Sequence, residues 1–492
     1  MPNLKITSSL DDEYIVIGLQ ENEGKLEVVQ SGDVVESDSF LPLVGKLGLR
    51  ATADEVMQIP VNGRIVITTG LGKALPVVDH EALRRAAGSA ARALVGKKSA
   101  TFAIGYSGIE EFAAIAEGAA LGAYEFNDFK SESEQKEPLA DIVIHCASSS
   151  KEHQEQLSRA QIMAENISFI RDLINTPPSH LTPESFSQKA RKAAVNLGLK
   201  VEVLTDTTLK RKGYGGLIAV GQGSANPPRL LHISYAPVLK RKKELKHIAL
   251  VGKGITFDTG GLALKPAQGM EEMKSDMSGA AAAVAVVLAA AQLKLNIKVD
   301  AWAALAENMV SDKATRPSDI ITIYGGKTVE VLNPDAEGRL VLADALVRAA
   351  ESAKDKLDGI INIATLTGAQ VVALGTRTAA VMTNNEDFSN TFLAAAKKSG
   401  EKFWPMPLPQ ELRASLDSPV ADIANIGERM GGMLVAGLFL KEFVKPDQPW
   451  LHLDIAGPAF NADKAYGYTP VGGTGVALRS LITLLETLST PL

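Results

Sequence analysis

Short apolar runs with the composition of strands alternate with helix-like stretches along this chain of 492 residues, and this alternation constrains the fold more than any other feature. Four runs in the first 150 residues are rich in Ile and Val: Tyr14–Leu19, Arg64–Ile67, Thr101–Ile104 and Asp141–His145. Four later runs are Val201–Leu204, Ile248–Val251, Ala301–Ala304 and Gly359–Ala364. Because alternating strands and helices build sheets covered by helices, the pattern predicts an α/β protein with largely parallel sheets.

One long amphipathic helix interrupts this alternation near residue 150. Its apolar side chains recur at three- and four-residue spacing: Leu157, Ala160, Met163, Ile167, Ile170 and Ile174. The segment Asn175-Thr-Pro-Pro-Ser179 then ends the helix, because proline lacks a backbone donor. Since 492 residues are too many for one compact core, we place the domain junction here. We expect an N-terminal α/β domain at 1–150, a connecting helix and linker at 151–178, and a larger domain at 179–492.

The charge balance and the single cysteine argue against several classes of protein. Lys and Arg total 51 against 57 for Asp and Glu, a net charge of −6 that gives no attraction to nucleic acid or anionic lipid. The one cysteine, Cys146, fits a reducing compartment. The first residues lack a secretory pattern, and the longest apolar run, Gly279–Ala291, is too short to span a bilayer. We therefore expect a cytoplasmic protein, with neither membrane nor nucleic acid as a partner.

Reactive side chains gather directly after one predicted strand. Ile248–Val251 is followed by Gly252-Lys253-Gly254, and then by Asp258 and two more glycines. In open α/β sheets, ligands bind where strands end at their carboxyl side, and glycine lets the backbone approach closely. The spacing fits neither GxxxxGK[ST] nor GxGxxG, so it does not predict a phosphate loop. Lys265 and Asp276 precede an alanine-rich helix, which Asp276 could alternatively cap.

A second charged segment, NPDAEGRL at 333–340, precedes another predicted helix. Pro334 favours extended geometry in the residue before it. If the chain stays extended, residues two apart share a face, so Asp335, Glu337 and Arg339 would point the same way. Two carboxylates so placed repel each other unless a cation lies between them. The alternative interpretation is a solvated acidic turn with an arginine salt bridge.

Together the two segments hold four acidic and three basic side chains: Asp258, Asp276, Asp335, Glu337, Lys253, Lys265 and Arg339. Oxygen-rich clusters of this kind suit one or two divalent metal ions. None of the seven histidines lies in either segment or has HExxH or zinc-finger spacing, so we interpret each as structural. The sequence has no GxSxG motif, which argues against a serine hydrolase.

Eight stretches of the sequence resemble the leucyl aminopeptidase family of dinuclear metallopeptidases, also called the cytosol aminopeptidase family. They are RDLINTPPSHLTP, AVGQGSANPP, VGKGITFDTGG, LALKP, MKSDMSG, NPDAEGRL, ATLTGA and HLDIAGPA, in family order. The resemblance extends from about Arg171 to the last residue, whereas the first 150 residues match only in α/β pattern and in AYEFNDFK. It implies a smaller N-terminal α/β domain and a larger C-terminal catalytic domain with a mixed, mostly parallel sheet flanked by helices.

The resemblance also implies a role for each matching residue. The ligands of two divalent ions would be Lys253, Asp258, Asp276, Asp335 and Glu337. Asp258 and Glu337 would bridge the two ions. Lys265 resembles the catalytic lysine, and Arg339 resembles the catalytic arginine, which holds a bicarbonate. The pocket for the first substrate side chain would be lined by Met273, Thr365, Gly368, Ala456 and Ala459, with a backbone contact from Leu366.

By the same resemblance, the protein is expected to release N-terminal amino acids, preferentially leucine and other apolar residues, from peptides with a free amine. A hydroxide bridging the two metals would attack the scissile carbonyl. The ions would be Mn²⁺ or Zn²⁺, with Mg²⁺ an option at one site, and the family assembles as homohexamers. The family signature usually has Thr where this chain has Pro334, a change that bears on metal preference.

Two other functions compete with this interpretation. A two-metal phosphoesterase would use a second Gly-rich anion nest, which these segments lack. A DNA-binding or scaffold role would have to rest on the basic runs at 210–212 and 240–243. The acidic net charge opposes that role, and we interpret both runs as solvated loops.

Overall fold

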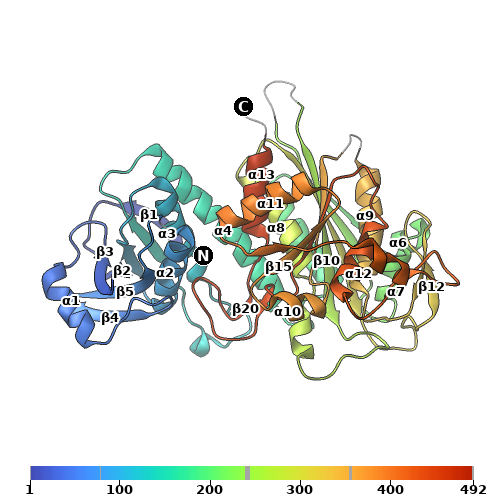
Figure 1. Ribbon diagram of the computed structural model, residues 1–492, viewed down its shortest axis with the longest axis horizontal. Coiled ribbons are helices and arrows are strands. Elements are labelled where there is room, and N and C mark those ends of the chain that lie inside the picture. Colours follow the sequence, from blue (N-terminus) through green and yellow to red (C-terminus); the bar gives the residue numbers. More distant parts are fainter. Residues whose placement is uncertain (1, 78, 239–243, 354–356, 490–492) are drawn as a thin grey trace. The chain divides into compact units, whose positions relative to one another are not determined.

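The structure is a computed structural model that describes residues 2–77, 79–238, 244–353 and 357–489 (Figure 1). Two compact units form, one from Met1–Ser168 with Asp463–Val471 and the other from Phe169–Ala462 with Gly472–Leu492. The units divide inside helix α4, Lys151–Asn175, which is the helix that was predicted to connect the domains. The α/β class and the two-domain organisation are confirmed.

The first unit is built on a largely parallel sheet. Its strands are β1 Asn3–Thr7, β2 Tyr14–Asn22, β3 Lys25–Val29, β4 Val56–Val61, β5 Arg64–Lys73, β6 Ser99–Phe102 and β7 Asp141–His145. Its helices are α1 Ser37–Lys46, α2 His80–Ala93, α3 Ile109–Gly122 and the 3-10 turn η1 Glu132–Glu134. The strand order is β1-β7-β6-β2-β5-β4, with β3 on β2, and only β3 and β4 pair antiparallel among the described strands. Each strand predicted in this part overlaps an observed one.

The second unit contains the longer strands. They are β8 Lys200–Leu204, β9 Arg229–Tyr235, β10 His247–Asp258, β11 Lys298–Asn308, β12 Asp319–Thr322, β13 Thr328–Val331, β14 Gly359–Ala364, β15 Ala379–Thr383, β16 Phe403–Pro405, β17 Ile423–Ala424, β18 Trp450–Asp454, β19 Phe460–Asn461 and β20 Gly472–Gly473. The main sheet has the order β16-β15-β18-β14-β10-β11-β9-β8. Its centre, from β18 to β11, is parallel, and antiparallel pairs flank it on both sides, so the sheet is mixed as expected.

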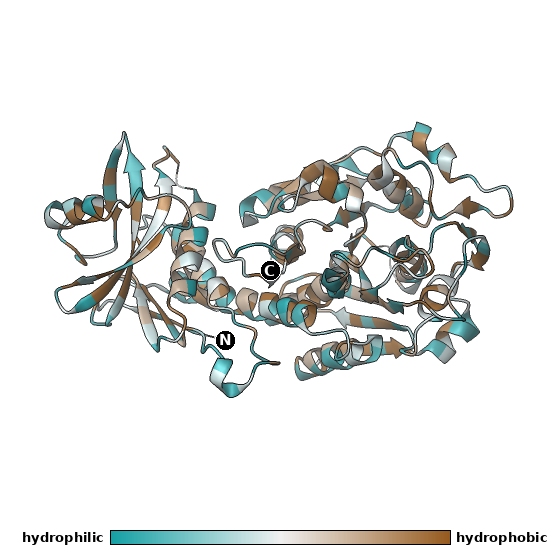
Figure 2. Ribbon diagram, turned by 90° about the horizontal axis from the view of Figure 1, so that it is seen from below, coloured by the Kyte–Doolittle hydropathy of each residue, from teal (hydrophilic) through white to brown (hydrophobic). Residues whose placement is uncertain are grey.

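Helices cover this sheet. They are α5 Pro183–Asn196, α6 Asp206–Lys212, α7 Gly215–Gly221, α8 Ser278–Gln292, α9 Gly338–Ser352, α10 Gly368–Leu374, α11 Glu386–Ser399, α12 Gly432–Lys441 and α13 Leu478–Leu488, with 3-10 helices η2 Met270–Ser275 and η3 Gln410–Leu416. The basic run 210–212 forms the exposed last turn of α6 and not a loop, whereas 240–243 lies outside the described residues. In Figure 2, hydrophilic residues gather mainly in loops and on outer helix faces.

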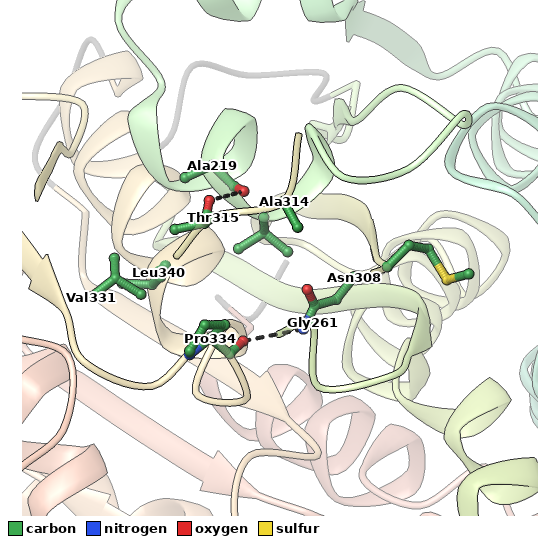
Figure 3. Close-up of a pocket in the computed structure, with 10 residues that line it drawn as sticks. Ala219, Gly261, Asn308, Ala314, Thr315, Val331, Pro334 and Leu340 are labelled. Carbon is green, nitrogen blue, oxygen red and sulfur yellow. Dashed lines mark hydrogen bonds between the residues drawn. The ribbon is translucent and has the colours of Figure 1, made fainter. Parts of the chain in front are cut away.

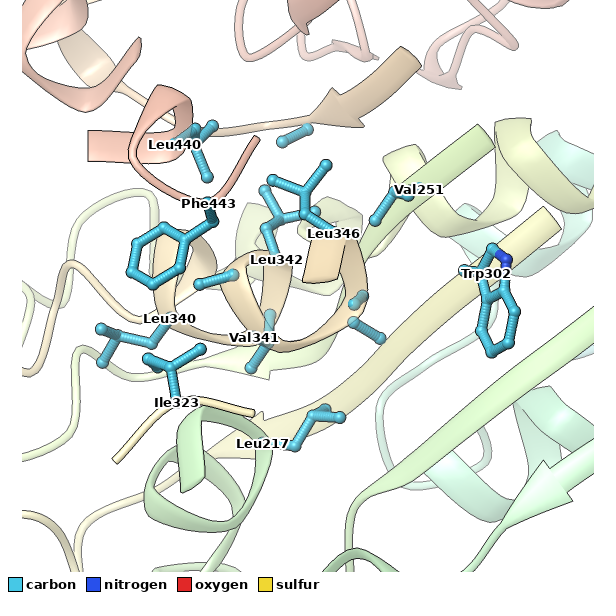
Figure 4. Close-up of a cluster of buried hydrophobic side chains, with 14 of the residues drawn as sticks. Leu217, Val251, Trp302, Ile323, Leu340, Val341, Leu342, Leu346, Leu440 and Phe443 are labelled. Carbon is cyan, nitrogen blue, oxygen red and sulfur yellow. The ribbon is translucent and has the colours of Figure 1, made fainter. Parts of the chain in front are cut away.

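The strand β10 is covered by helices on both faces. Since successive residues of a strand face opposite sides of the sheet, two neighbouring residues of β10 meet different helices. Val251 belongs to a large core cluster, which includes Leu342 and Leu346 of α9 (Figure 4). Gly252, the next residue, lies against the backbone of Ala280 in α8. Helix α8 is buried almost throughout. It is the core of the segment 270–292, which has the length and hydropathy of a membrane span, but 89% of the 18-residue apolar window in that segment is buried within the protein. Its apolar composition therefore serves the core.

Candidate metal centre

The charged residues of both sequence segments meet where the central parallel strands of the main sheet end. Lys253 and Asp258 belong to β10, and Asp276 directly follows η2. Glu337 immediately precedes α9, and Thr365 directly follows β14. The carboxyl edge of a parallel sheet is the usual ligand-binding edge of α/β folds. The structure thus brings the two segments together at one edge of the sheet.

Backbone-to-backbone packing brings Asp276 to Lys253. A Cβ at Gly252 would lie 2.4 Å from the Cα of Ala280, and one at Gly279 would lie 2.0 Å from the carbonyl O of Ile363. Glycine at both positions lets the start of α8 approach the strands more closely than any side chain would permit. Asp276, which lies two residues before the first residue of α8, is thereby held beside Lys253 in the middle of β10.

Lys253 lies at the centre of the cluster and is 3% exposed. Its Nζ is 2.8 Å from Asp276 Oδ1 and 2.8 Å from Glu337 Oε1. It also donates a hydrogen bond of 2.9 Å to the carbonyl O of Thr365. Burial by itself lowers the pKa of Lys253, but the surrounding carboxylates outweigh burial and raise that pKa above its usual range.

Lys265 bridges the other two carboxylates. Its Nζ is 2.8 Å from Asp258 Oδ2 and also contacts Asp335 Oδ1. One ligand atom from each of Asp258, Asp335 and Glu337 lies within 4.8 Å of the others, so a single cation could reach all three. Asp276 joins the group through Lys253 and through Thr365 Oγ1, which donates to Asp276 Oδ1 at 2.8 Å.

Two sequence interpretations need correction. Asp276 does not cap α8, because the cap position is Met277 and no side chain caps that end. The chain also does not stay extended through the second segment. Glu337 has helical backbone angles (φ −77°, ψ −36°) and Arg339 lies in the first turn of α9. Arg339 consequently faces the carbonyl O of Asn425, to which its Nη1 donates at 2.7 Å. The alternative of a solvated acidic turn is excluded, since Glu337 is 2% exposed.

The electrostatics of the centre favour cations. Burial raises the pKa of Asp276, of Glu337 and of Asp335, and neighbouring carboxylates add to the effect. Four carboxylates face the ammonium groups of Lys253 and Lys265, which leaves two formal negative charges to be balanced in a largely buried space. Uncompensated buried charge is costly, so divalent ions would stabilise this arrangement.

The residues present fit divalent metal ions. Among the described side chains, Asp276 Oδ2 and Glu337 Oε2 are buried and have no hydrogen-bond partner, so both oxygens are available as ligands. The donor set of carboxylates and one amine suits Mn²⁺, Zn²⁺ or Mg²⁺. The assignment of Lys253, Asp258, Asp276, Asp335 and Glu337 as the ligands remains a prediction.

Asn425 positions the second segment, although nothing in the sequence pattern marked it. Its side chain is fully buried. Asn425 Oδ1 accepts from the backbone N of Leu332 and of Asn333 at 2.8 and 3.2 Å, and Nδ2 donates to Asn333 O at 2.7 Å. Its own carbonyl accepts from Arg339. One residue directly after β17 thus holds both the ligand-bearing turn and the arginine.

Most of the residues expected to line a substrate pocket lie on two segments, 365–368 and 456–459, that Asp454 joins. Asp454 Oδ1 accepts from the backbone N of Leu366 at 3.1 Å and of Ala456 at 3.2 Å. Thr365 touches Lys253 and Asp276 directly, as described above. Gly368 is exposed, Ala459 is buried, and Met273 lies in η2. Their pocket role stays a prediction. Asp454 lies within the HLDIAGPA stretch, so the sequence did contain a signal for it.

Replacement of Gly338 by alanine should displace Lys253. A Cβ at Gly338 would lie 2.5 Å from Lys253 Cε and 2.8 Å from its Nζ. Such overpacking typically costs about 1–3 kcal/mol. We expect the Gly338→Ala variant to unfold at lower urea concentration and to lose most of its activity, as measured by urea denaturation and by peptide hydrolysis.

Gly432→Ala provides the matched control. Gly432 is the first residue of α12, as Gly338 is of α9, but its Cβ would meet nothing closer than Ala369 Cβ at 3.8 Å. This variant should keep wild-type stability and activity. Equal behaviour of the two variants would contradict the packing argument.

Comparison with known proteins identifies the family. Residues 168–482 match the catalytic domain of the cytosol aminopeptidase family, and residues 40–133 match its N-terminal domain. A probable cytosol aminopeptidase of Streptomyces avermitilis is 48% identical over 97% of this chain and 96% of its own length. One of Nocardia farcinica is 46% identical over 99% and 97%. The solved structure titled bottromycin maturation enzyme BotP in complex with Mn is 37% identical, covers 97% of this chain and 100% of its own, and has a TM-score of 0.86.

These matches extend over both units and reach well beyond the site. The two-domain α/β fold with an oxygen-rich centre on its larger unit is that of a metal-dependent hydrolase. The chain belongs to the cytosol aminopeptidase family, and its activity is that of a metal-dependent aminopeptidase. The expected resemblance is therefore confirmed, and it includes the first unit, where the sequence motifs were sparse.

Proposed function

We propose that the protein is a dinuclear aminopeptidase that releases N-terminal residues, with a preference for leucine and other apolar side chains. The observation that carries the proposal is the convergence of the buried Asp258 and Glu337 with the half-buried Asp335 within 4.8 Å, with Lys253 and Asp276 beside them. Divalent ions bound there would supply Lewis acidity toward the scissile carbonyl and a hydroxide at neutral pH. The Mn complex of the similar BotP supports such ions.

Lys265 is the residue we assign to the developing oxyanion. Its side chain is 21% exposed, in contrast to the buried Lys253, so it can reach a bound peptide. Burial lowers its pKa, but Asp258 and Glu337 outweigh burial and raise it, which keeps the group cationic at neutral pH. Loss of one such electrostatic donor costs roughly 10²–10³-fold in kcat in other enzymes.

Arg339 is assigned to hold a bicarbonate that carries the proton. Burial lowers the pKa of Arg339 to about 10, so it remains charged at neutral pH. Its Nη1 is engaged by Asn425 O, and its guanidinium lies 5.9 Å from the ring centroid of Phe439. Among the described side chains, the buried Arg339 Nε has no hydrogen-bond partner, and such a donor is available to an anion.

The metals, the assembly and the location are part of the same proposal. The amine and carboxylate ligands accept Mn²⁺ or Zn²⁺ at both positions and Mg²⁺ at one. We propose a homohexamer in the cytoplasm that acts on peptides with a free amine and binds neither membrane nor nucleic acid. Support comes from the family, from the net charge of −6 and from the buried free thiol of Cys146.

Hydrolysis of leucine p-nitroanilide and of its N-acetyl form tests the proposal. A free amine can ligate a cation, whereas an acylated amine has lost its lone pair to the amide. We expect turnover of only the free-amine substrate, loss of turnover after chelation, and recovery with Mn²⁺. Comparable turnover of the acetylated substrate, or activity that survives chelation, would overturn the proposal. Leucine, glutamate and lysine p-nitroanilides compared under one condition test the apolar preference.

A further inference from the structure

One side chain of β11 contacts both segments that carry the predicted ligands. Asn308, the last residue of β11, is 5% exposed. Its Nδ2 donates to Asp258 Oδ1 at 2.8 Å and to the carbonyl O of Pro334 at 3.1 Å. Its own carbonyl accepts from Thr259 N at 3.0 Å and from Thr259 Oγ1 at 2.9 Å. Asn308 is therefore tied to the end of β10 and to the 333–337 turn.

These contacts fix the orientation of the Asp258 carboxylate. Asp258 Oδ1 also accepts from the backbone N of Gly260 at 2.9 Å, so two N–H donors face this one oxygen. The other oxygen, Oδ2, lies 2.8 Å from Lys265 Nζ. Without the two donors the carboxylate could rotate about its χ2 torsion, which is broad for aspartate. The donors therefore determine which oxygen faces the centre of the cluster.

The surroundings of Asn308 leave its amide little choice of orientation. Asn308, Pro334 and Gly261 line one side of a small pocket, whose other walls come largely from apolar residues such as Val331 and Leu340 (Figure 3). A Cβ at Gly261 would lie 2.9 Å from Asn308 Oδ1, so glycine there makes room for the amide. The hydroxyl of the polar wall residue Thr315 is engaged with Ala219 O and Gln222 Nε2. The amide N–H groups of Asn308 are directed to Asp258 and Pro334.

We infer that Asn308 is a positioning residue for metal binding, which orients Asp258 and holds it at a fixed separation from the turn that carries Asp335. The inference rests on the proposed function, because it assumes that these carboxylates bind metal. Hydrogen-bond partners of metal ligands typically contribute 10–100-fold in metal affinity or activity. Pro334 takes part through its carbonyl only, so the replacement of the usual Thr leaves this contact intact.

Titration of the metal-free protein with Mn²⁺ by calorimetry tests the inference. Asn308→Leu keeps the branched shape of the side chain and removes the donor, whereas Asn308→Ala also leaves a cavity. Asn226→Ala is the matched control, because Asn226 Nδ2 donates to Glu307 Oε2 at 2.9 Å, one residue from Asn308, and Glu307 is not a predicted ligand. We expect the dissociation constant for Mn²⁺ to rise about 10–100-fold in both Asn308 variants and to stay within threefold of wild type in Asn226→Ala.

The melting temperature of the metal-free variants separates positioning from folding. We expect Asn308→Leu to melt within a few degrees of Asn226→Ala while its Mn²⁺ affinity falls. Wild-type affinity in both Asn308 variants, or an equal loss in the control, would overturn the inference alone. Absence of Mn²⁺ binding by the wild-type protein would instead overturn the proposed function, and the inference with it.

Discussion

Replacement of Glu337 by glutamine is expected to lower kcat/KM for leucine p-nitroanilide by at least about 10²–10³-fold, the effect of losing one buried electrostatic group in an active site. Glu337 is 2% exposed, its Oε1 lies 2.8 Å from Lys253 Nζ, and its Oε2 has no partner among the described residues. Glutamine keeps the shape of the side chain but removes the charge and replaces one acceptor by a donor. Hydrolysis rates after loading with Mn²⁺, together with Mn content after dialysis, measure the effect.

Glu330→Gln controls for the loss of a buried glutamate. Glu330 lies in β13, is 8% exposed and accepts from Ser418 Oγ at 2.6 Å, which an amide oxygen can also do. We expect this variant to stay within threefold of wild-type activity and to retain its Mn. A Glu337→Gln enzyme with full Mn content and unchanged kcat/KM would contradict the assignment of Glu337 to the metal centre.

Lys253→Met is expected to destabilise the metal-free protein by about 3–5 kcal/mol at pH 8, the usual cost of removing one partner from a buried charge pair. The variant leaves Asp276 and Glu337 buried without their closest cation. Both carboxyl groups already have raised pKa values because of burial, and Lys253 opposes that rise. Its removal therefore raises both pKa values further.

The pH dependence of this loss follows from proton linkage. A carboxyl group whose pKa is raised on folding binds protons in the folded state at pH values where the unfolded chain does not. Its destabilising effect is therefore present at high pH and diminishes as the pH falls through the raised pKa. The difference in the free energy of unfolding between wild type and Lys253→Met should therefore become smaller as the pH falls from 8 to 5. Urea unfolding in the presence of a chelator measures this difference.

Lys327→Met gives the more solvent-accessible counterpart of this substitution. Lys327 Nζ also forms an ion pair of 2.8 Å, with Glu442 Oε2, but its side chain is 35% exposed. Exposed pairs contribute about 0–1 kcal/mol, so this variant should lose little stability at either pH. If Lys253→Met loses the same free energy of unfolding at pH 5 and at pH 8, the carboxyl groups of Asp276 and Glu337 do not titrate as argued.

Much of the fold could be read from local sequence. The runs 248–251, 301–304 and 359–364 each lie inside an observed strand, because a strand buried on both faces must be apolar throughout. The long helix at 151–174 also formed as predicted, through its three- and four-residue spacing. The shared face of Asp335, Glu337 and Arg339 depended on an extended chain, and that condition is not met, because Pro334 restricts only the residue before it. The backbone is already helical at Glu337, and α9 begins at Gly338.

The sequence by itself determined the α/β class, the family and the charged residues of the site, because apolar periodicity and motif spacing are local properties of the chain. Only the tertiary structure decided which groups meet. Asn308 reaches Asp258 because β11 lies beside β10, and Asn425 reaches Arg339 from a segment 86 residues further along the chain. Such contacts depend on the order of the strands in the sheet and on the close packing of α8 at Gly252. Neither can be predicted from the spacing of motifs along the chain.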